Sequence, residues 1–308
     1  MTAVAERDEF SEGGWTLRAG AMVLGSGGIV SIDEFDKISD DDRASLHEAL
    51  ESQTVSVAKA GIIATFITKT AVLAAAGHWD ALWNLGDMVG YGASPNEVLQ
   101  VVRPLATLTV RGNHDRVCCG LTSTRNFNPT ARAAAKWTME ELSAENLEWL
   151  RGLPQGPLYP ERKTPDEARV ALAHGSPLNE DQYIQNMRDA WAPLRQMTAA
   201  ITFVGHTHIQ GGFAQRDHDW HELRPRYAGR AGGASWTLAI APGMRCLINP
   251  GAVGQPRDFD WRAAFAIYDS EANEVEYRRV PYNVAAAQGR VRTAGLPERL
   301  AARLREGR

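Results

Sequence analysis

The stretch Thr109–Asp115 constrains the fold most, because an apolar, strand-like run breaks at a glycine and then presents an amide, an imidazole and a carboxylate in succession. Gly112 allows the backbone to turn sharply there. The side chains of Asn113 and His114 are both suitable ligands for borderline divalent metals. One such strand end predicts a metal site only if other strands of the chain also end in ligands.

Ligand-type side chains do follow three other apolar runs: Asp87 after 79–85, His174 after 169–173, and His206 and His208 after 201–204. A helix from Ser94 to about Arg103 is predicted between strands 79–85 and 105–110, which indicates a parallel β-α-β unit. Sites in open α/β sheets lie at the carboxyl edge of parallel strands. A lone histidine is more often a satisfied core or surface residue than a ligand. The repeated placement of Asp, Asn and His side chains directly after strands favours a shared metal site.

The composition indicates a globular α/β protein of ordinary charge. The 308 residues are 44% hydrophobic, which is enough for one large core or two smaller ones. A net charge of -4 gives no electrostatic argument for nucleic-acid or membrane binding. Three cysteines without a disulfide pattern suit a reducing compartment, and no apolar run is long enough to cross a bilayer. We therefore expect a cytoplasmic protein without a membrane partner.

Residues 71–282 resemble the calcineurin-like metallophosphoesterases. The resemblance rests on five ordered blocks, namely GDMVGYG at 86–92, GNHD at 112–115, AHGSP at 173–177, GHTH at 205–208 and NPGAVGQPRD at 249–258. It implies a two-sheet sandwich flanked by helices and hydrolysis of a phosphomonoester or phosphodiester. The implied cofactor is Mn, Fe or Zn, and the implied partner is a phosphorylated substrate.

The same resemblance implies roles for single residues. Asp87 would bridge two metals, Asn113, His174 and His206 would complete the second site, and His208 would belong to the first. His114 would stabilise the phosphoryl oxygens and protonate the leaving group, while Asp115 would orient its ring. Paired ions of this kind clamp an ester and activate water.

The chain departs from this family at the first strand. The family's D-x-H motif supplies two ligands to the first metal, and the corresponding positions fall near Gly61 and Ile63, which cannot coordinate an ion. We therefore expect one firmly held metal, a second held weakly or not at all, and impaired hydrolysis.

The N-terminal part has a different character. Asp33 and Glu34 follow an apolar run, as Walker B acids do, although a solvated helix N-terminus would read the same way. Residues 2–76 resemble the AAA+ core of minichromosome maintenance (MCM) helicases, which implies ATP and Mg²⁺ contacts for Asp33 and Glu34 and a DNA contact for Lys59. Because the chain has no GxxxxGK[ST] phosphate loop, we expect no autonomous ATPase or helicase activity.

These observations predict three segments: a partial AAA+ fragment at 1–76, a phosphoesterase domain at 77–285, and a basic, solvated helical tail at 286–308. A hairpin is predicted at 54–65. The N-terminal part is expected either to pack poorly or to supply a substitute first strand, Ile62–Phe66. Residues 215–235 are expected to form a mobile loop, with a substrate-contacting flap as the alternative. The leading hypothesis is a metal-dependent phosphoesterase. The alternatives are a DNA-associated or MCM-ring-associated module and an inactive fusion product.

Overall fold

The computed structural model describes the strands Ala3–Arg7, Trp15–Ala19, Thr54–Lys59 and Ile62–Ile67, and residues 79–308 except 161–167 and 231. Side chains are described only in the range that begins at residue 79. The chain divides into two compact units, Met1–Asp80 and Ala81–Arg308, which are treated separately below.

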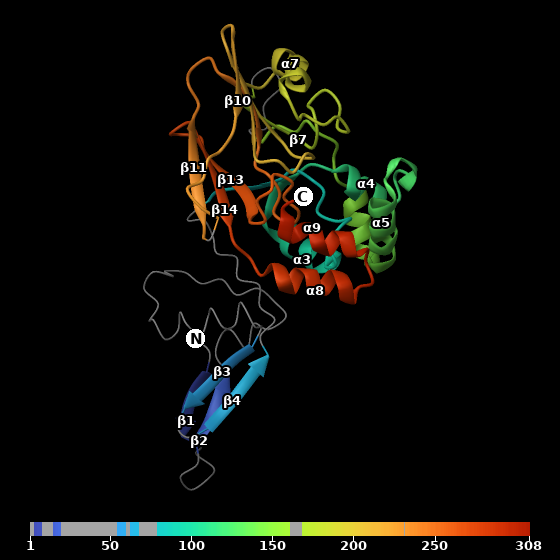
Figure 1. Ribbon diagram of the computed structural model, residues 1–308, viewed down its shortest axis with the longest axis vertical. Helices are drawn as coiled ribbons and strands as arrows, with labels where there is room; N and C mark the ends of the chain where they lie inside the picture. The colour runs from blue at the N-terminus through green and yellow to red at the C-terminus, as the bar shows by residue number, and fades with distance from the viewer. Residues whose placement is uncertain are drawn as a thin grey trace. The chain divides into compact units, whose positions relative to one another are not determined.

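The described strands of the first unit form two antiparallel hairpins. One joins β1 (Ala3–Arg7) to β2 (Trp15–Ala19), and the other joins β3 (Thr54–Lys59) to β4 (Ile62–Ile67), with Lys59 opposite Ile62 (Figure 1). The second hairpin confirms the prediction for 54–65, whereas the first was not predicted. Within the first unit β4 pairs with β3 in a two-stranded sheet, and its substitution for the first phosphoesterase strand stays a prediction.

The second unit contains a five-stranded sheet in the order β10-β9-β12-β8-β7. Its strands are β7 (Val170–Ala173), β8 (Ile201–Val204), β9 (Gly211–Arg216), β10 (Asp219–Leu223) and β12 (Arg245–Asn249). The strands β7, β8 and β12 run parallel, and β9 and β10 are antiparallel additions at one edge. The prediction of a loop over 215–235 is therefore wrong for 215–223, which lies mostly in β9 and β10, whereas residues 224–230 and 232–233 contain no helix or strand.

Two smaller sheets complete this unit. One has the antiparallel order β11-β14-β13, with β11 at Ala234–Ala239, β13 at Ala263–Asp269 and β14 at Glu274–Val280. The other pairs β5 (Leu82–Asn84) with β6 (Ala106–Thr109) in parallel. One buried cluster joins Leu172 and Ile201 of the five-stranded sheet to Val275 and Tyr277 of β14. The sheets therefore pack face to face around a shared apolar core.

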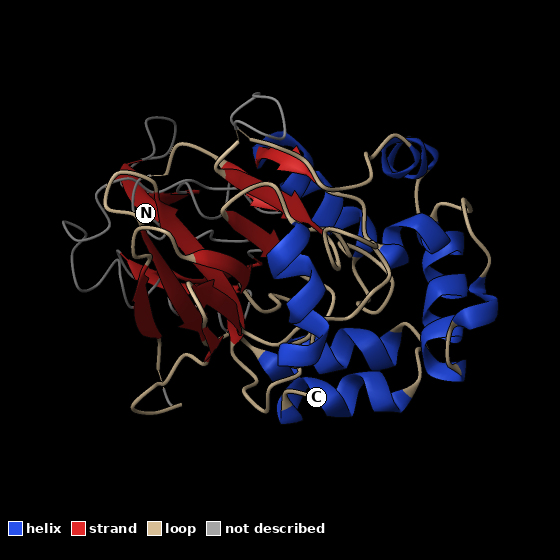
Figure 2. Ribbon diagram, turned by 90° about the horizontal axis from the view of Figure 1, so that it is seen from above, coloured by secondary structure: helices blue, strands red, loops and turns tan. Residues whose placement is uncertain are grey.

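The described helices of the second unit are α3 (Pro95–Leu105), α4 (Asn113–Cys118), α5 (Pro129–Glu141), α6 (Ala144–Arg151), α7 (Met187–Gln196), α8 (Val284–Thr293) and α9 (Glu298–Glu306), with a 3-10 turn at Thr124–Asn126. Most of them gather on one side of the strands (Figure 2). Asn128 and Ser143 cap α5 and α6: each side chain accepts a backbone N–H three residues on, at 2.9 and 3.2 Å, which fixes the starts of these helices.

The C-terminal segment is part of the fold rather than a solvated tail. Leu300 and Ala301 of α9 are 1% and 0% exposed and pack with Val291 of α8 and Ala134 of α5. The periodicity predicted the helix, but helical spacing alone does not show what the apolar face covers. None of the described helices is long and apolar enough to cross a membrane.

Candidate metal centre

Four strand ends supply the predicted ligands. Asp87 follows β5, Asn113 begins α4 just after β6, His174 follows β7 directly, and His206 follows β8. The pairs β5–β6 and β7–β8 are both parallel, which confirms the predicted β-α-β arrangement. Within each pair the chain leaves the sheet at the same edge, and this brings the ligands together.

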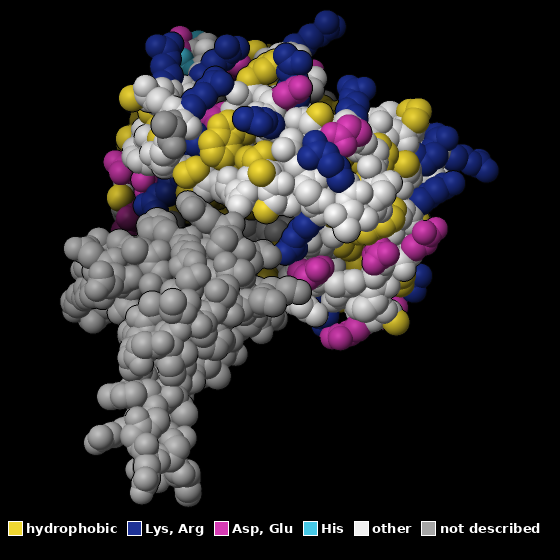
Figure 3. All heavy atoms as spheres, turned by 60° about the horizontal axis from the view of Figure 1, so that its bottom comes forward, with side chains coloured by type: hydrophobic (Ala, Val, Ile, Leu, Met, Phe, Trp, Pro, Cys, Tyr) yellow, Lys and Arg dark blue, Asp and Glu magenta, His cyan; other side chains and the backbone are white. Residues whose placement is uncertain are grey.

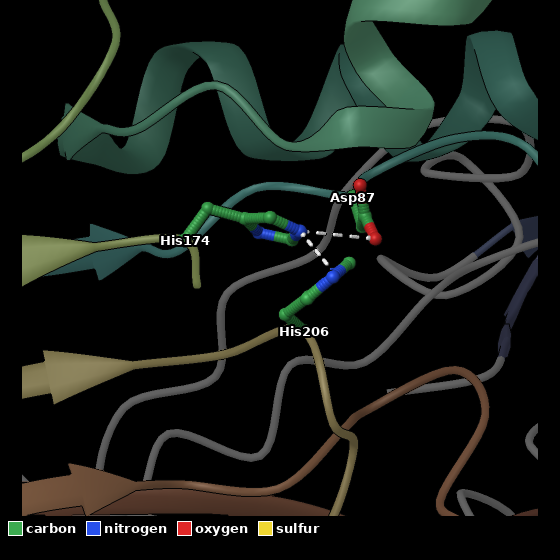
Figure 4. Close-up of side chains that lie close together, drawn as sticks. All are labelled: Asp87, His174 and His206. Atoms are coloured by element: carbon green, nitrogen blue, oxygen red, sulfur yellow. Dashed lines mark hydrogen bonds and ion pairs between the residues drawn. The ribbon is translucent and has the colours of Figure 1, made fainter. Parts of the chain in front are cut away.

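His174 lies at the centre of this group. Its Nε2 atom is 3.3 Å from Asp87 Oδ2 and 3.1 Å from His206 Nδ1 (Figure 4). The same atom is 3.2 Å from Asn113 Oδ1. Two ligands of one ion, with bonds of about 2.1 Å at right angles, lie about 3 Å apart. The ligand atoms of Asp87, His174 and His206 also fall within 4.8 Å of one another. The spacing therefore fits one divalent cation.

The tautomer of His174 supports the same conclusion. Its Nδ1 is 2.7 Å from the carbonyl oxygen of Leu85, which can only accept, so Nδ1 carries the proton. In the neutral ring, Nε2 then directs its lone pair at the oxygens of Asp87 and Asn113, which also carry lone pairs. That arrangement is repulsive unless a cation or a proton lies between the atoms. A metal-bound histidine usually donates its other ring N–H to a carboxylate, a backbone carbonyl or water, and here the Leu85 carbonyl accepts that hydrogen bond.

The backbone at the ligands is strained. Asp87, His206 and His208 have φ angles of 56°, 63° and 61°, in the left-handed region that residues other than glycine rarely adopt. Each such residue costs on the order of 1–3 kcal/mol, and such residues cluster at functional sites. The strand ends are held in these conformations by contacts around them.

Two glycines allow the strand ends to meet. A Cβ atom on Gly112 would lie 2.2 Å from Asp87 Oδ1, and one on Gly86 would lie 2.5 Å from the nitrogen of Gly112. The φ of Gly112 is -91°, a value that any residue can adopt, so no unusual backbone turn requires glycine here. Glycine is required because Asp87 approaches its backbone so closely. The same approach lets the backbone N–H of His114 donate to Asp87 Oδ1 at 2.8 Å.

Asp115 holds these loops and does not orient His114 as predicted. Its fully buried carboxylate accepts backbone N–H groups of Asp87 at 2.8 Å, Met88 at 2.9 Å and Gly112 at 3.0 Å. A carboxylate at the third position of α4 can reach back to the start of its own helix, which explains the contact with Gly112. The prediction had assumed that Asp115 faces the imidazole ring of His114 because the two residues are adjacent in the sequence.

The ring of His114 is held by aromatic contacts instead. It lies between Tyr91 and Phe127, with ring centroids 4.3 and 4.5 Å away. Its buried Nδ1 has no hydrogen-bond partner among the described residues. A Cβ atom on Gly90 would lie 2.4 Å from that nitrogen, so this position of the ring requires glycine there.

His208 stands apart from the group around His174. Its Nδ1 lies 2.8 Å from the carbonyl oxygen of Gln255, so Nδ1 carries the proton and Nε2 presents a lone pair. The described residues that converge on one point are Asp87, His174 and His206, and His208 does not belong to that set. The assignment of His208 to another metal position stays a prediction.

Comparison with known proteins decides the family. The family model of the calcineurin-like phosphoesterase superfamily domain matches residues 64–273, which is more than half of the chain. The chain belongs to the calcineurin-like phosphoesterase superfamily. The match begins after Gly61 and Ile63, the positions where the first ligand motif was expected.

Solved structures and sequence relatives agree with membership of this superfamily. The crystal structure of a metallophosphoesterase from Sphaerobacter thermophilus is 39% identical with a TM-score of 0.63, over 77% of this chain and 91% of that one. An uncharacterized protein of Methanocaldococcus jannaschii is 33% identical over 227 residues, which are 73% of this chain and 85% of the relative. A hypothetical protein of Pyrococcus horikoshii, 21% identical with a TM-score of 0.56, shares the fold.

The N-terminal resemblance is also confirmed. The family model of the MCM P-loop domain matches residues 1–89. The DNA replication licensing factor mcm5-A of Xenopus laevis is 51% identical over 84 residues, but these are only 11% of that protein. Asp33 and Glu34 lie outside the described residues, and Lys59 ends β3, where only the backbone is described.

Burial and neighbouring charges together shift the pKa values at the candidate centre. Burial lowers the pKa of His174, but the Asp87 carboxylate outweighs that effect and raises it to about 9. Burial alone would raise the pKa of Asp87, yet the nearby imidazoles of His174 and His114 hold it far below its usual range. Burial, with the positive charge of His174, lowers the pKa of His206 to about 4. At pH 7 these shifts leave Asp87 anionic, His206 neutral and His174 protonated, so a metal bound at this centre would displace the proton from His174 Nε2.

Three residues around the site were missed from the sequence. Tyr183 stacks on His206 with ring centroids 3.8 Å apart and an interplanar angle of 19°. Tyr91 contacts His114, and Arg257 donates its backbone N–H to the carbonyl oxygen of His208 at 3.0 Å. Tyr91 and Arg257 lie inside the blocks that carried the family resemblance, but Tyr183 has no such signal.

A cavity of about 520 Å³ lies beside this region and not within it. Thr207, Asn249 and Arg257 line it, together with the buried pair Asp260 and Arg262, but none of the predicted metal ligands does. The arrangement of donor atoms, rather than the size of a hollow, therefore identifies the candidate centre.

Proposed function

We propose that the unit Ala81–Arg308 is a metal-dependent phosphoesterase, with one divalent ion held by Asp87, Asn113, His174 and His206. The observation that carries this proposal is the position of His174 Nε2, which faces oxygen and nitrogen atoms of the other three residues at 3.1–3.3 Å. Imidazole and carboxylate ligands suit Mn²⁺, Fe or Zn²⁺. The substrate is a phosphorylated compound.

The protein's own residues prepare the site for this chemistry. A divalent ion in this position supplies Lewis acidity to a phosphoryl group. The Leu85 carbonyl fixes the His174 tautomer, and Asp115 ties the Asp87 loop to the start of α4. The ligands are thus held before a substrate binds, which is the condition for efficient electrostatic catalysis.

His114 is proposed to contact the substrate. Burial lowers the pKa of this imidazole in the free protein, so it is neutral at pH 7 and donates one N–H to a phosphoryl oxygen. An anionic phosphate beside the ring favours its protonated form, which can then pass a proton to the leaving oxygen. In this proposal Asp115 acts through the backbone rather than on the ring.

Hydrolysis of p-nitrophenyl phosphate and bis(p-nitrophenyl) phosphate with added Mn²⁺ tests the function. We expect His114→Ala to lower kcat by about 100-fold or more, as removal of a general acid does, with metal content unchanged. His221→Ala, at an exposed position of β10, is the matched control and should retain full activity. Equal rates for wild type and His114→Ala would overturn the proposal.

Impairment at the first metal position is a separate part of the proposal. His208 lacks the partners that Gly61 and Ile63 would need to supply. Metal analysis of the purified protein should give one equivalent per chain. The double variant Gly61→Asp, Ile63→His tests whether the missing ligands cause the impairment. A second equivalent of metal with a large rise in activity would indicate a hydrolase weakened by fusion. Unchanged metal content and activity would mean that these two positions do not lie at the site.

A second candidate function rests on the match of residues 1–89 to the MCM P-loop domain. In this alternative the N-terminal unit associates with DNA or with an MCM ring, and Lys59 contributes to the DNA contact. The expected observation is DNA binding that weakens with salt and is reduced by Lys59→Ala. Absence of both DNA binding and association with a full-length MCM helicase would eliminate this alternative.

A further inference from the structure

An exposed tyrosine covers one of the candidate metal ligands. The ring of Tyr183, in the loop after β7, stacks on the imidazole of His206 with centroids 3.8 Å apart. His206 is buried, whereas Tyr183 is 43% exposed. Nδ1 of the same imidazole faces Nε2 of His174 in the group of converging ligands (Figure 4). The tyrosine ring therefore lies at the edge of the candidate metal centre and is open to solvent.

Exposure alone does not distinguish this tyrosine. Single exposed apolar side chains are common on globular proteins. On the face shown in Figure 3, hydrophobic side chains are exposed between Lys, Arg, Asp and Glu side chains. Trp191 of α7 is 50% exposed, and the guanidinium carbon of its helix neighbour Arg195 lies 4.8 Å from its ring centroid. Tyr183 differs from Trp191 because it contacts a candidate metal ligand and because its loop is held in place.

Ion pairs and a backbone hydrogen bond hold this loop. Arg116 of α4 bonds through Nη1 to Glu180, and through Nη2 to both carboxylate oxygens of Asp181 at 2.7 and 2.9 Å. The backbone N–H of Ser176 donates to the carbonyl oxygen of Gln182, which directly precedes the tyrosine, at 3.1 Å. One guanidinium that spans two carboxylates is a specific and strong arrangement. The tyrosine ring is therefore in place before any ligand binds.

A second tyrosine lies close to the first. The ring centroid of Tyr91 is 4.3 Å from that of His114. Burial raises the pKa of Tyr91, the guanidinium of Arg257 opposes that shift, and the titrating hydroxyl of Tyr183 adds to it. Because such charge effects weaken with distance, the two phenol groups are near each other. Aromatic rings therefore accompany both His206 and His114, the histidines that contact the metal and the phosphoryl group in the proposed function.

We propose that Tyr183, with Tyr91 beside it, binds a planar aromatic ring in the organic part of the substrate, so that the enzyme prefers phosphate esters that carry such a ring. This inference rests on the proposed function, because a phosphate held at the metal centre brings its organic group next to these tyrosines. Stacked aromatic rings attract each other beyond the effect of buried area, and a ring already fixed in place loses little freedom on binding. Tyr183 is a specificity residue in this scheme and has no part in the chemical step.

Binding of two matched phosphonates tests the aromatic subsite without turnover. Benzylphosphonate and cyclohexylmethylphosphonate have the same carbon skeleton, but only benzylphosphonate contains a planar aromatic ring. Calorimetry on the full chain at saturating Mn²⁺ should show that benzylphosphonate binds about three- to tenfold more tightly. Burial of apolar surface alone would not produce this order, because the cyclohexyl group has the larger apolar surface. A preference for benzylphosphonate therefore reports stacking.

Tyr183→Leu keeps an apolar side chain without a ring, so it should remove the preference while leaving the affinity for cyclohexylmethylphosphonate unchanged. Tyr183→Phe should keep the preference. Trp191→Leu removes a similarly exposed aromatic ring from α7 and is the matched control, which should also keep it.

Equal affinity of wild type for the two phosphonates would overturn the aromatic subsite, and so would an unchanged preference in Tyr183→Leu. Either result leaves the proposed function intact if both phosphonates bind in a Mn²⁺-dependent way. Failure of both phosphonates and of inorganic phosphate to bind would overturn both proposals.

Discussion

The two units of the chain differ in what their sequence matches imply. The match to the MCM relative is 51% identical over 84 residues, yet it spans only 11% of that protein. The phosphoesterase match has only 33–39% identity, but it spans most of the relatives. Identity measures recent common ancestry, whereas activity requires the whole set of interacting residues. The longer and more divergent match therefore says more about chemistry.

The same contrast exists at the level of residues. Asp33 and Glu34 are predicted to be Walker B acids by the MCM resemblance alone, and the chain has no GxxxxGK[ST] phosphate loop to complete such a site. In the second unit four strand ends converge, so that His174 Nε2 contacts the other three side chains. We therefore expect substitutions in the second unit to change metal affinity, stability or activity strongly, and substitutions in the first unit to leave activity unchanged.

The largest effect should come from His174→Ala. This change removes the central ligand, and loss of outer partners of metal ligands alone costs about 10–100-fold in metal affinity, so we expect at least 100-fold here. Metal content after dialysis and Mn²⁺ titration measure the effect. His218→Ala, at an exposed site in the β9–β10 turn, is the control. Unchanged metal content in His174→Ala would mean that the converging side chains do not form the site.

Asp260→Asn should cost about 3 kcal/mol of folding free energy, because it leaves the guanidinium of Arg262 buried without its ion-pair partner. Arg262 is 0% exposed and bonds to both Asp260 carboxylate oxygens, at 3.0 and 2.6 Å. Denaturant unfolding of wild type and variant measures the difference. Such a loss would locate a stability determinant of the second unit in the wall of the cavity beside the candidate site.

The pH dependence of this difference has a definite sign. Burial alone would raise the pKa of Asp260, but hydrogen bonds from Arg262 hold it below its ordinary value. A depressed carboxyl pKa stabilises the folded state above the unfolded pKa of about 3.9, and this stabilisation is lost as pH falls through the folded value. The difference between wild type and Asp260→Asn should therefore shrink below about pH 4. A constant difference from pH 7 to pH 3 would contradict it.

Tyr183→Ala should have a smaller effect on metal affinity. The stacked ring limits the orientations of His206, and aromatic contacts of this kind contribute about 0.5–1.5 kcal/mol, or up to about tenfold in affinity. Tyr183→Phe keeps the ring and should behave as wild type. Equal affinities of the Ala and Phe variants would show that the stacking does not position the ligand.

Much of the site was predictable because it depends on local pattern. Asp87, Asn113, His174 and His206 each follow a strand, and parallel strands bring their ends together whatever the loops between them do. Contacts between distant segments were not predictable. The stacking of Tyr183 on His206 depends on the path of a loop, and no periodicity encodes that path.

The same limit explains the errors. Asp115 was assigned to its neighbour His114, but helix geometry turns its carboxylate back toward Gly112. The terminal helix was expected in solvent because amphipathic spacing does not identify what the apolar face contacts, and here it buries Leu300. Arg303 reaches Tyr91 only because of that packing.

The smallest effect should come from the first unit. Glu34→Gln removes the acid that would polarise water in a Walker B site, a change that eliminates hydrolysis in an intact nucleotide site. Without a phosphate loop there is no nucleotide hydrolysis to lose, so ATP turnover should be at background in wild type and variant alike. Phosphoesterase activity with Mn²⁺ should also stay within about twofold, since no predicted metal ligand lies in this unit. A selective loss of ATP turnover in Glu34→Gln would contradict the expected lack of catalysis in the first unit, because that unit would then hydrolyse nucleotide itself.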